Sequence, residues 1–201
     1  MAAKVSIEDL QRAGIGAFFR ARDVAGLGFA HYRLQRMVAE GSLERVGPGL
    51  YRVAAAEFTE METIAMVASA VPHAIVCLIS ALRIHEIGTQ SPHQVWLAID
   101  RKARKPARLP ITTSIVRFSG QMLSYGVITQ PMQGVKVRLT NPARTVVDCF
   151  RYRNKIGLDV AMEALRDAVR SRKAMVSEID RAAEVCRIKT VIGPYLEALS
   201  A

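Results

Sequence analysis

The order of elements in the N-terminal quarter of the sequence constrains the fold more than any other feature. Three short helices are expected, over residues 6–14, 21–25 and 30–40, with glycines between or after them. Two β-type runs, residues 43–46 and 50–53, then flank a Gly-Pro-Gly turn and predict a hairpin. Helix, helix, helix, hairpin is the plan of a winged helix-turn-helix.

The third helix of this plan carries polar side chains near its start and an apolar stripe of Leu34, Met37 and Val38. In a helix-turn-helix, such N-terminal residues meet base edges in the major groove of DNA. Arginine suits guanine, glutamine suits adenine, and arginines in the wing suit phosphates. The expected DNA contacts are His31, Tyr32, Arg33, Gln35, Arg36, Arg45 and Arg52. An ordinary solvated helix face is the alternative for Arg33 and Arg36.

After a linker over residues 54–59, the pattern changes to mixed strands and helices. Thr59 and Glu62 form a capping box for a helix over residues 60–70. Strands are expected at 94–100, 111–118 and 135–139, with a weaker one near 127, and helices at 142–152, 158–172, 177–187 and 194–199. We therefore predict an α+β chain. A winged helix-turn-helix over residues 1–56 is followed by a mixed α/β domain over 57–201, with a helical C-terminal part.

Positive charge is the main compositional signal. The formal net charge is +10 at pH 7, which favours a polyanionic partner. The charge is spread along the chain and does not locate a binding face. Its densest run, residues 101–108, holds Arg101, Lys102, Arg104, Lys105 and Arg108. This run is either a solvated loop or a second basic patch for a DNA backbone, tRNA or an acidic partner.

Three segments together resemble a known family. The runs 41–46 and 49–52 resemble the N-terminal domain of AbiEi-type antitoxins of type IV toxin–antitoxin systems. Residues 80–85 resemble that family's "SAL…H" segment, and residues 140–148 its "T-x-P-A-R-T-x-x-D" segment. The resemblance implies autorepression by the winged domain at an operator of inverted repeats. It also implies a C-terminal domain that antagonises a nucleotidyltransferase toxin. The wing tip Gly47-Pro48-Gly49 lacks the basic residue that is often found there.

Two residues of the last segment, Arg144 and Asp148, lie four apart on an expected helix and so share one face. Two interpretations remain open for them. They form a structural ion pair near the start of the helix, or they belong to a contact surface for the toxin or a second protomer.

Chemical motifs are weak in this sequence. Glu86 with Asp100-x-Lys102 loosely resembles the acidic-acidic-lysine set of metal-dependent nucleases, which is one alternative function. A second alternative is a stand-alone regulator whose second domain senses a ligand. The nucleotidyltransferase pattern is absent, and the four histidines have no metal-ligand spacing. We expect no enzyme activity, no metal and no cofactor.

The cysteines and the apolar stretches bear on the compartment. Three scattered cysteines with no CxxC are typical of free thiols in a reducing environment. Residues 1–11 do not have the pattern of a signal peptide. The uncharged stretch 63–82 contains Pro72 and His73 at its centre, which favours two separate elements over a membrane helix. We expect a cytoplasmic protein without a membrane span.

Overall fold

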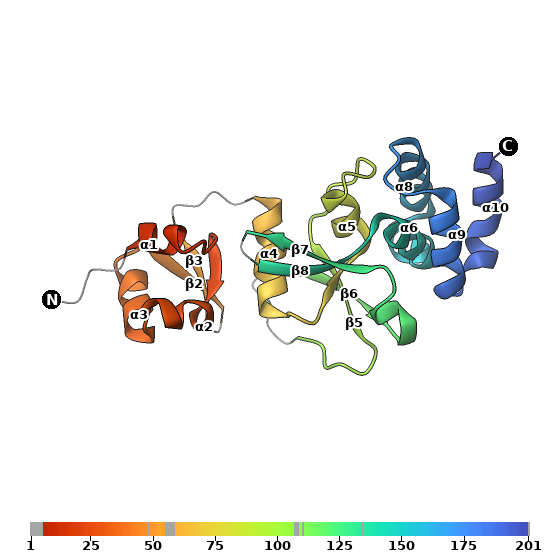
Figure 1. The fold of residues 1–201 in the computed structure, drawn as a ribbon. Coiled ribbons are helices and arrows are strands. Elements are labelled where there is room, and N and C mark those ends of the chain that lie inside the picture. Colours follow the sequence, from red (N-terminus) through yellow and green to blue (C-terminus); the bar gives the residue numbers. More distant parts are fainter. Residues whose placement is uncertain are drawn as a thin grey trace. The chain divides into compact units, whose positions relative to one another are not determined.

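The computed structural model describes residues 6–47, 49–54, 59–106, 109, 111–133 and 135–200. Its fold is α+β, as predicted (Figure 1). The described residues divide into two compact units. The first unit is formed by those of Met1–Pro72, Pro106–Ile111 and Gln130–Val137, and the second by those of His73–Lys105, Thr112–Thr129 and Arg138–Ala201. This division by contacts differs from a linear boundary between residues 56 and 57, which stays a prediction.

The N-terminal region has the helix and strand order of a winged helix-turn-helix. Its elements are α1 (Ile7–Arg12), β1 (Phe18–Arg20), α2 (Ala21–Val24), the 3₁₀ turn η1 (Ala25–Leu27), α3 (His31–Ala39), β2 (Leu43–Gly47) and β3 (Leu50–Val53). The sheet order is β1-β3-β2, with both pairs antiparallel. A small core beneath α3 contains Leu34, Phe19 and Tyr51, and the rings of Phe19 and Tyr51 stack with their centroids 6.0 Å apart.

The remaining elements begin with α4 (Glu60–Ala70), which belongs to the first unit. Thr59 and Glu62 cap this helix reciprocally, as the sequence predicted. The other strands and short turns are β4 (Ile75–Val76), β5 (Val95–Asp100), β6 (Thr113–Phe118), η2 (Gly120–Leu123), β7 (Val127–Met132) and β8 (Val135–Thr140). The other helices are α5 (Leu78–Ile84), α6 (Pro142–Arg151), α7 (Arg153–Ile156), α8 (Leu158–Arg170), α9 (Val176–Val185) and α10 (Lys189–Ser200).

A mixed five-stranded sheet has the order β6-β5-β4-β8-β7. The short strand β4 lies at its centre, antiparallel to β5 and parallel to β8. Strands β5 and β6 are parallel, and Val95 pairs with Thr113. Parallel neighbours need a crossover connection, and the basic run lies in the sequence between β5 and β6.

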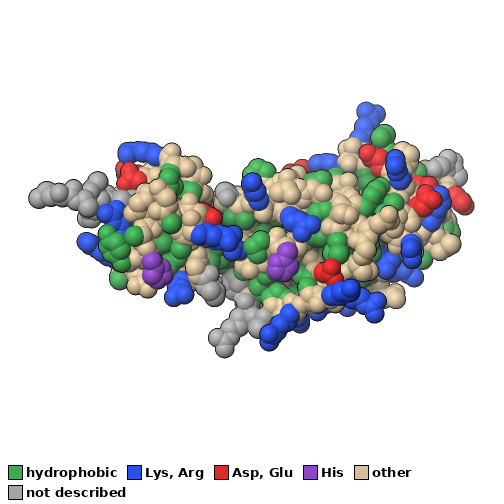
Figure 2. Space-filling view, turned by 60° about the horizontal axis from the view of Figure 1, so that its bottom comes forward, with side chains coloured by type: hydrophobic (Ala, Val, Ile, Leu, Met, Phe, Trp, Pro, Cys, Tyr) green, Lys and Arg blue, Asp and Glu red, His purple; other side chains and the backbone are tan. Residues whose placement is uncertain are grey.

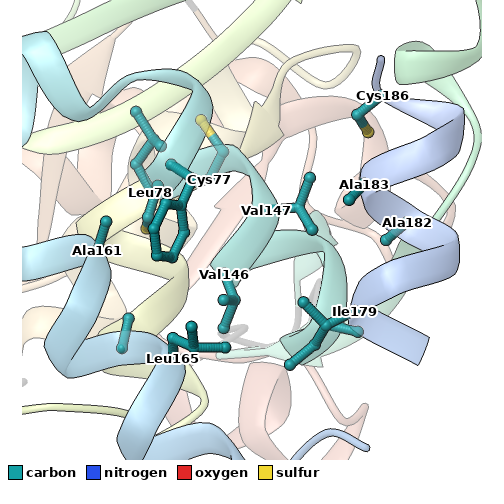
Figure 3. Close-up of a cluster of buried hydrophobic side chains, with 14 of the residues drawn as sticks. Cys77, Leu78, Val146, Val147, Ala161, Leu165, Ile179, Ala182, Ala183 and Cys186 are labelled. Atoms are coloured by element: carbon teal, nitrogen blue, oxygen red, sulfur yellow. The ribbon is translucent and has the colours of Figure 1, made fainter. Parts of the chain in front are cut away.

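Helix α6 forms the centre of the second unit. Its residues from Ala143 to Phe150 are all buried, and α5, α8, α9 and α10 contact it. Val146 and Val147 of α6 point into a cluster that includes Leu165 of α8 and Ile179 of α9 (Figure 3). Substantial burial of this kind is the main favourable contribution to folding of the unit.

Strand β1 and helix α10 differ from the sequence predictions for identifiable physical reasons. Strand β1 was not predicted, because its three residues are too few to show a period. Helix α10 begins at Lys189, whereas only residues 194–199 were predicted to be helical. Pro194 lies inside α10, where it removes a backbone donor. Burial of Ile192 and Leu196 on the same side of the helix holds the turn containing Pro194 in place.

Candidate nucleic-acid interface

Helix α3 separates a buried face from a polar one. Leu34 and Met37 are buried against the core of the winged region, and α3 packs on β2. His31, Gln35 and Arg36 are exposed on the other side. Since the spacing of Leu34 and Met37 fixes the rotation of the helix, the same spacing fixes which side chains are free to meet a partner.

The polar side chains at the start of α3 are joined by local contacts. His31 and Gln35 are in hydrogen-bond contact, with 3.0 Å between His31 Nε2 and Gln35 Nε2. Arg33 donates from Nε to the hydroxyl of Tyr32 at 3.0 Å, and from Nη1 to the carbonyl of Gly28 at 3.3 Å. The side chain of Tyr32 is nevertheless 65% exposed. These contacts orient donors and an aromatic ring at the helix start without burying them.

Arg36 is engaged near the other end of the helix. Its Nε lies 2.8 Å from Glu40 Oε1, and the two side chains are 71% and 48% exposed. An exposed pair at this spacing contributes only about 0.5 kcal/mol or less. A stronger anionic ligand can therefore displace Glu40 at little cost.

In the hairpin formed by β2 and β3, the two arginines that were expected to contact phosphates differ in their exposure to solvent. Arg45 is exposed, as a phosphate contact requires. Arg52 is buried: its side chain is 4% exposed, its Nη1 donates to Glu44 Oε2 at 2.9 Å, and its guanidinium lies over the ring of Phe18. The prediction that Arg52 reaches phosphates is therefore wrong. Because β1 covers one side of β3, β3 is a central strand and not part of a free two-stranded wing. Of the wing tip, Pro48 lies outside the described residues.

The basic run after β5 is exposed where it is described. Arg101, Lys102, Arg104 and Lys105 are exposed, and Arg108 lies outside the described residues. Arg117 of β6 holds the loop by donating from Nη1 to the carbonyls of Asp100 and Ala103, at 2.9 and 2.6 Å. The side chains face solvent, as a second basic patch requires, but so do many others. The face drawn in Figure 2 shows lysine and arginine side chains spread over it rather than gathered in one region.

Arg144 and Asp148 are not available as a contact surface. They form an ion pair with 2.9 Å between Arg144 Nε and Asp148 Oδ1, and both side chains are 0% exposed. Arg144 also donates to the carbonyls of Tyr125 and Met122 and lies 4.9 Å from the ring centroid of Phe118. The interpretation as a partner surface is therefore wrong, and the internal ion pair is confirmed. Burial raises the pKa of Asp148 to about 6, although the Arg144 guanidinium acts in the opposite direction.

The two later segments of the family resemblance, residues 80–85 and 140–148, contact each other in the core of the second unit. His85 Nε2 lies 2.6 Å from the carbonyl oxygen of Thr140, and burial lowers the pKa of His85. Because a carbonyl oxygen can only accept, His85 Nε2 donates this hydrogen bond. Thr145 closes the network through its hydroxyl contact with Thr140 Oγ1 at 2.7 Å. Asn141 caps α6 by accepting from the backbone N–H of Arg144. These residues hold β8, α5 and α6 together, which is a structural role that the sequence pattern alone did not reveal.

The two acids considered for a nuclease site, Glu86 and Asp100, each contact another group of the protein. Glu86 Oε2 lies 3.3 Å from Lys173 Nζ, and Asp100 Oδ1 accepts from the backbone N–H of Lys102 at 2.7 Å. Within the described ranges, no group of three or more His, Cys, Asp or Glu side chains could hold a metal ion. Burial raises the pKa of Cys77 and of Cys149 well above the usual value, so neither is an activated thiol. As for membranes, none of the helices described is both long enough and apolar enough to span one.

In the comparison with known proteins, the region around α3 matches a protein-family model. Residues 10–54 match a family model described as "Transcriptional regulator, AbiEi antitoxin". A search of curated proteins found no match to the chain. The matched segment includes β1, α2, α3 and both strands of the hairpin, and so contains all the winged-region residues discussed above. The part of this protein that presents α3 and the wing thus has the sequence pattern of the AbiEi antitoxin family of transcriptional regulators.

Proposed function

We propose that this protein is a transcriptional autorepressor that places α3 in the major groove of its own operator. The observation that carries the proposal is the exposed polar face of α3, set on a buried Leu34 and Met37 and followed directly by the hairpin. This arrangement lies within the segment that matches a family of transcriptional regulators. A helix presented in this way is the reading element of a helix-turn-helix protein.

Each exposed side chain of α3 suits a different part of a DNA duplex. Gln35 can pair with adenine and Arg36 with guanine, once Arg36 releases Glu40. Tyr32 offers an aromatic ring and a hydroxyl, and Arg33 adds charge at the helix start. Arg45 of β2 is placed for phosphates. The buried Arg52 takes no part in this proposal.

The test is binding to a duplex from immediately upstream of the gene, measured by fluorescence anisotropy. Changing Arg33 and Arg36 to alanine together should weaken binding by about tenfold to a hundredfold. Arg170→Ala is the matched control, because Arg170 is also an exposed helical arginine paired with an acid at 2.9 Å but lies in α8. Unchanged binding by a folded double variant would contradict the proposal.

Operator architecture follows from symmetry. Proteins with a helix-turn-helix commonly bind as two copies at inverted repeats, so that each α3 enters one half-site. We expect this protein to bind its operator in two steps or cooperatively. Removal of one half-site should then weaken binding of the protein to the half-site that remains. A gel-shift titration measures this effect.

The finer part of the proposal is that the protein acts as the antitoxin of a type IV system and counteracts a nucleotidyltransferase toxin. The name of the family matched by residues 10–54 supports this step, together with the order of the three family-like segments. Co-expression with the nucleotidyltransferase encoded beside the gene is the test. Rescue of growth by this protein would support an antitoxin, whereas continued toxicity would favour a stand-alone regulator.

We further propose that the chain is not an enzyme and works in the cytoplasm. The second point is supported by three free, buried cysteines, which are typical of proteins from reducing compartments. Mg²⁺-dependent cleavage of nucleic acid that is lost on Asp100→Ala would contradict the first point. An intact substrate after long incubation would support it.

A further inference from the structure

A cavity of about 320 Å³ lies in the first unit beside the winged region. It is lined by the end of β1 and the start of α2, by the last turn of α4, and by the beginning of β8. Its volume falls at the lower end of the range of small-molecule sites, roughly 300–1,000 Å³. This is enough space for a small ligand.

The cavity is lined by three cationic side chains from two segments that are far apart in sequence. Arg20 and Arg22 come from the junction of β1 and α2, and Lys136 comes from β8. Asp23 is the acidic residue among the lining residues. Its Oδ2 accepts from the backbone N–H of Arg20 at 3.1 Å, and its Oδ1 lies 3.7 Å from Arg22 Nε. Asp23 therefore offsets part of one charge and leaves the cavity positive.

Arg20 is partly buried, whereas Arg22 and Lys136 are exposed. Its Nη2 atom is buried and has no hydrogen-bond partner among the residues that the structure describes. Burial, and then repulsion from Arg22, lower the pKa of Arg20. A buried guanidinium donor without an acceptor is costly, since it has lost water without gaining a partner. An anion in the cavity would give the side chains of Arg20, Arg22 and Lys136 a partner of opposite charge.

The geometry points to a binding site for a small phosphate-bearing ligand, with Arg20 as its principal contact and Arg22 and Lys136 as flanking charges. Arginine binds phosphate through two parallel N–H donors, and a lysine adds a point charge. The phosphate belongs to a free small molecule, because none of the described residues that line the cavity comes from α3, the helix proposed to enter DNA. Some of the lining residues, such as Ser69 and Lys136, come from residues 57–201, the predicted second domain for which ligand sensing was an alternative.

Calorimetric titration of the full chain with inorganic phosphate, adenosine 5′-monophosphate and adenosine tests this site. Both phosphate-bearing probes should bind and adenosine should not. Arg20→Gln should weaken binding by about tenfold or more, because a charge-assisted contact is lost. Lys136→Gln should weaken it by a few-fold. Arg12→Gln is the control, because Arg12 is an exposed arginine of α1 that is paired with Glu8 and Asp9 and does not line the cavity.

Each outcome of the titrations either supports the phosphate site or overturns it. Binding that is reduced by Arg20→Gln and retained by Arg12→Gln supports the site. If Arg20→Gln does not fold, as judged by circular dichroism, the exposed Lys136 carries the test alone. Absence of binding by either phosphate-bearing probe at millimolar concentrations overturns the proposal, and so does equal binding by all variants. A reduced salt dependence of DNA binding in Arg20→Gln, without any phosphate binding, would assign Arg20 to the DNA backbone and also overturn it.

Discussion

Arg36 of α3 and Arg144 of α6 are each paired with an acid four residues later, and the two pairs have almost the same length. Arg36 and Glu40 are 2.8 Å apart, and Arg144 and Asp148 are 2.9 Å apart. The first pair is largely exposed, whereas the second is completely buried. Spacing in the sequence therefore predicts that a pair forms, and its surroundings decide what the pair does. In α3 the arginine can be released to a ligand, while in α6 it joins the core.

Loss of the buried arginine should have the largest effect. Arg144→Met leaves Asp148 buried without its partner and leaves the carbonyls of Tyr125 and Met122 without a donor. We expect the free energy of unfolding to fall by about 3–5 kcal/mol. Arg36→Met, the matched change in the exposed pair, should cost about 0.5 kcal/mol or less. Urea denaturation of the two variants measures the difference, and similar losses would remove the contrast between the helices.

The buried acid should also make stability depend on pH. Its pKa is about 6 in the folded protein against 3.8 for an ordinary aspartate, so the folded state binds this proton more tightly. The resulting stabilisation is complete below pH 3.8 and is lost as pH rises through 6, with a size of up to about 3 kcal/mol. Stability of the wild type relative to Asp148→Asn should therefore fall between pH 4 and pH 7. A rise over that range would mean that Arg144 dominates over burial.

A glycine beside the buried ion pair allows the packing around Arg144 to be tested by adding a methyl group. Gly126 has a positive φ of +65°, and a Cβ there would lie 2.8 Å from Cβ of Arg144. Gly126→Ala should lower the free energy of unfolding by about 2–3 kcal/mol. Gly120→Ala is the control, because Gly120 has a φ of +55° but no atom within 4 Å of the added Cβ. It should cost only about 1 kcal/mol. Equal costs in thermal or urea melts would show that Arg144 can move aside.

The smallest expected effect concerns the exposed pair. Glu40→Gln removes the competitor of Arg36 and one negative charge near the proposed DNA surface. Affinity for the operator duplex should rise by a few-fold, and stability should change by less than about 0.5 kcal/mol. Glu8→Gln is a suitable control, because Glu8 pairs with Arg12 on α1. An unchanged affinity would indicate that Arg36 does not contact the duplex.

Local signals in the sequence predicted much of this structure. The capping box of Thr59 and Glu62 could be identified because a cap depends on residues only three positions away. The apolar spacing of Leu34 and Met37 likewise gave the buried face of α3.

Features that depend on distant residues could not be predicted in this way. The burial of Arg52 results from β1 pairing with β3, and β1 is too short to show a period. The burial of Arg144 depends on Phe118, Met122 and Tyr125, which precede it by some twenty residues. The cavity beside Arg20 is closed by α4 and β8, so that no single segment of sequence contains it.

The most direct test of the proposed function is a salt titration of binding to the duplex upstream of the gene, compared with a scrambled duplex of the same length. We expect tight binding to the native duplex, with weaker and more salt-sensitive binding to the scrambled one, because base contacts by α3 add to the phosphate contacts. Arg36→Ala should reduce the difference in affinity between the native and the scrambled duplex. Equal binding to both, controlled by salt alone, would contradict sequence reading by α3 and leave only a generic attraction between a basic protein and DNA.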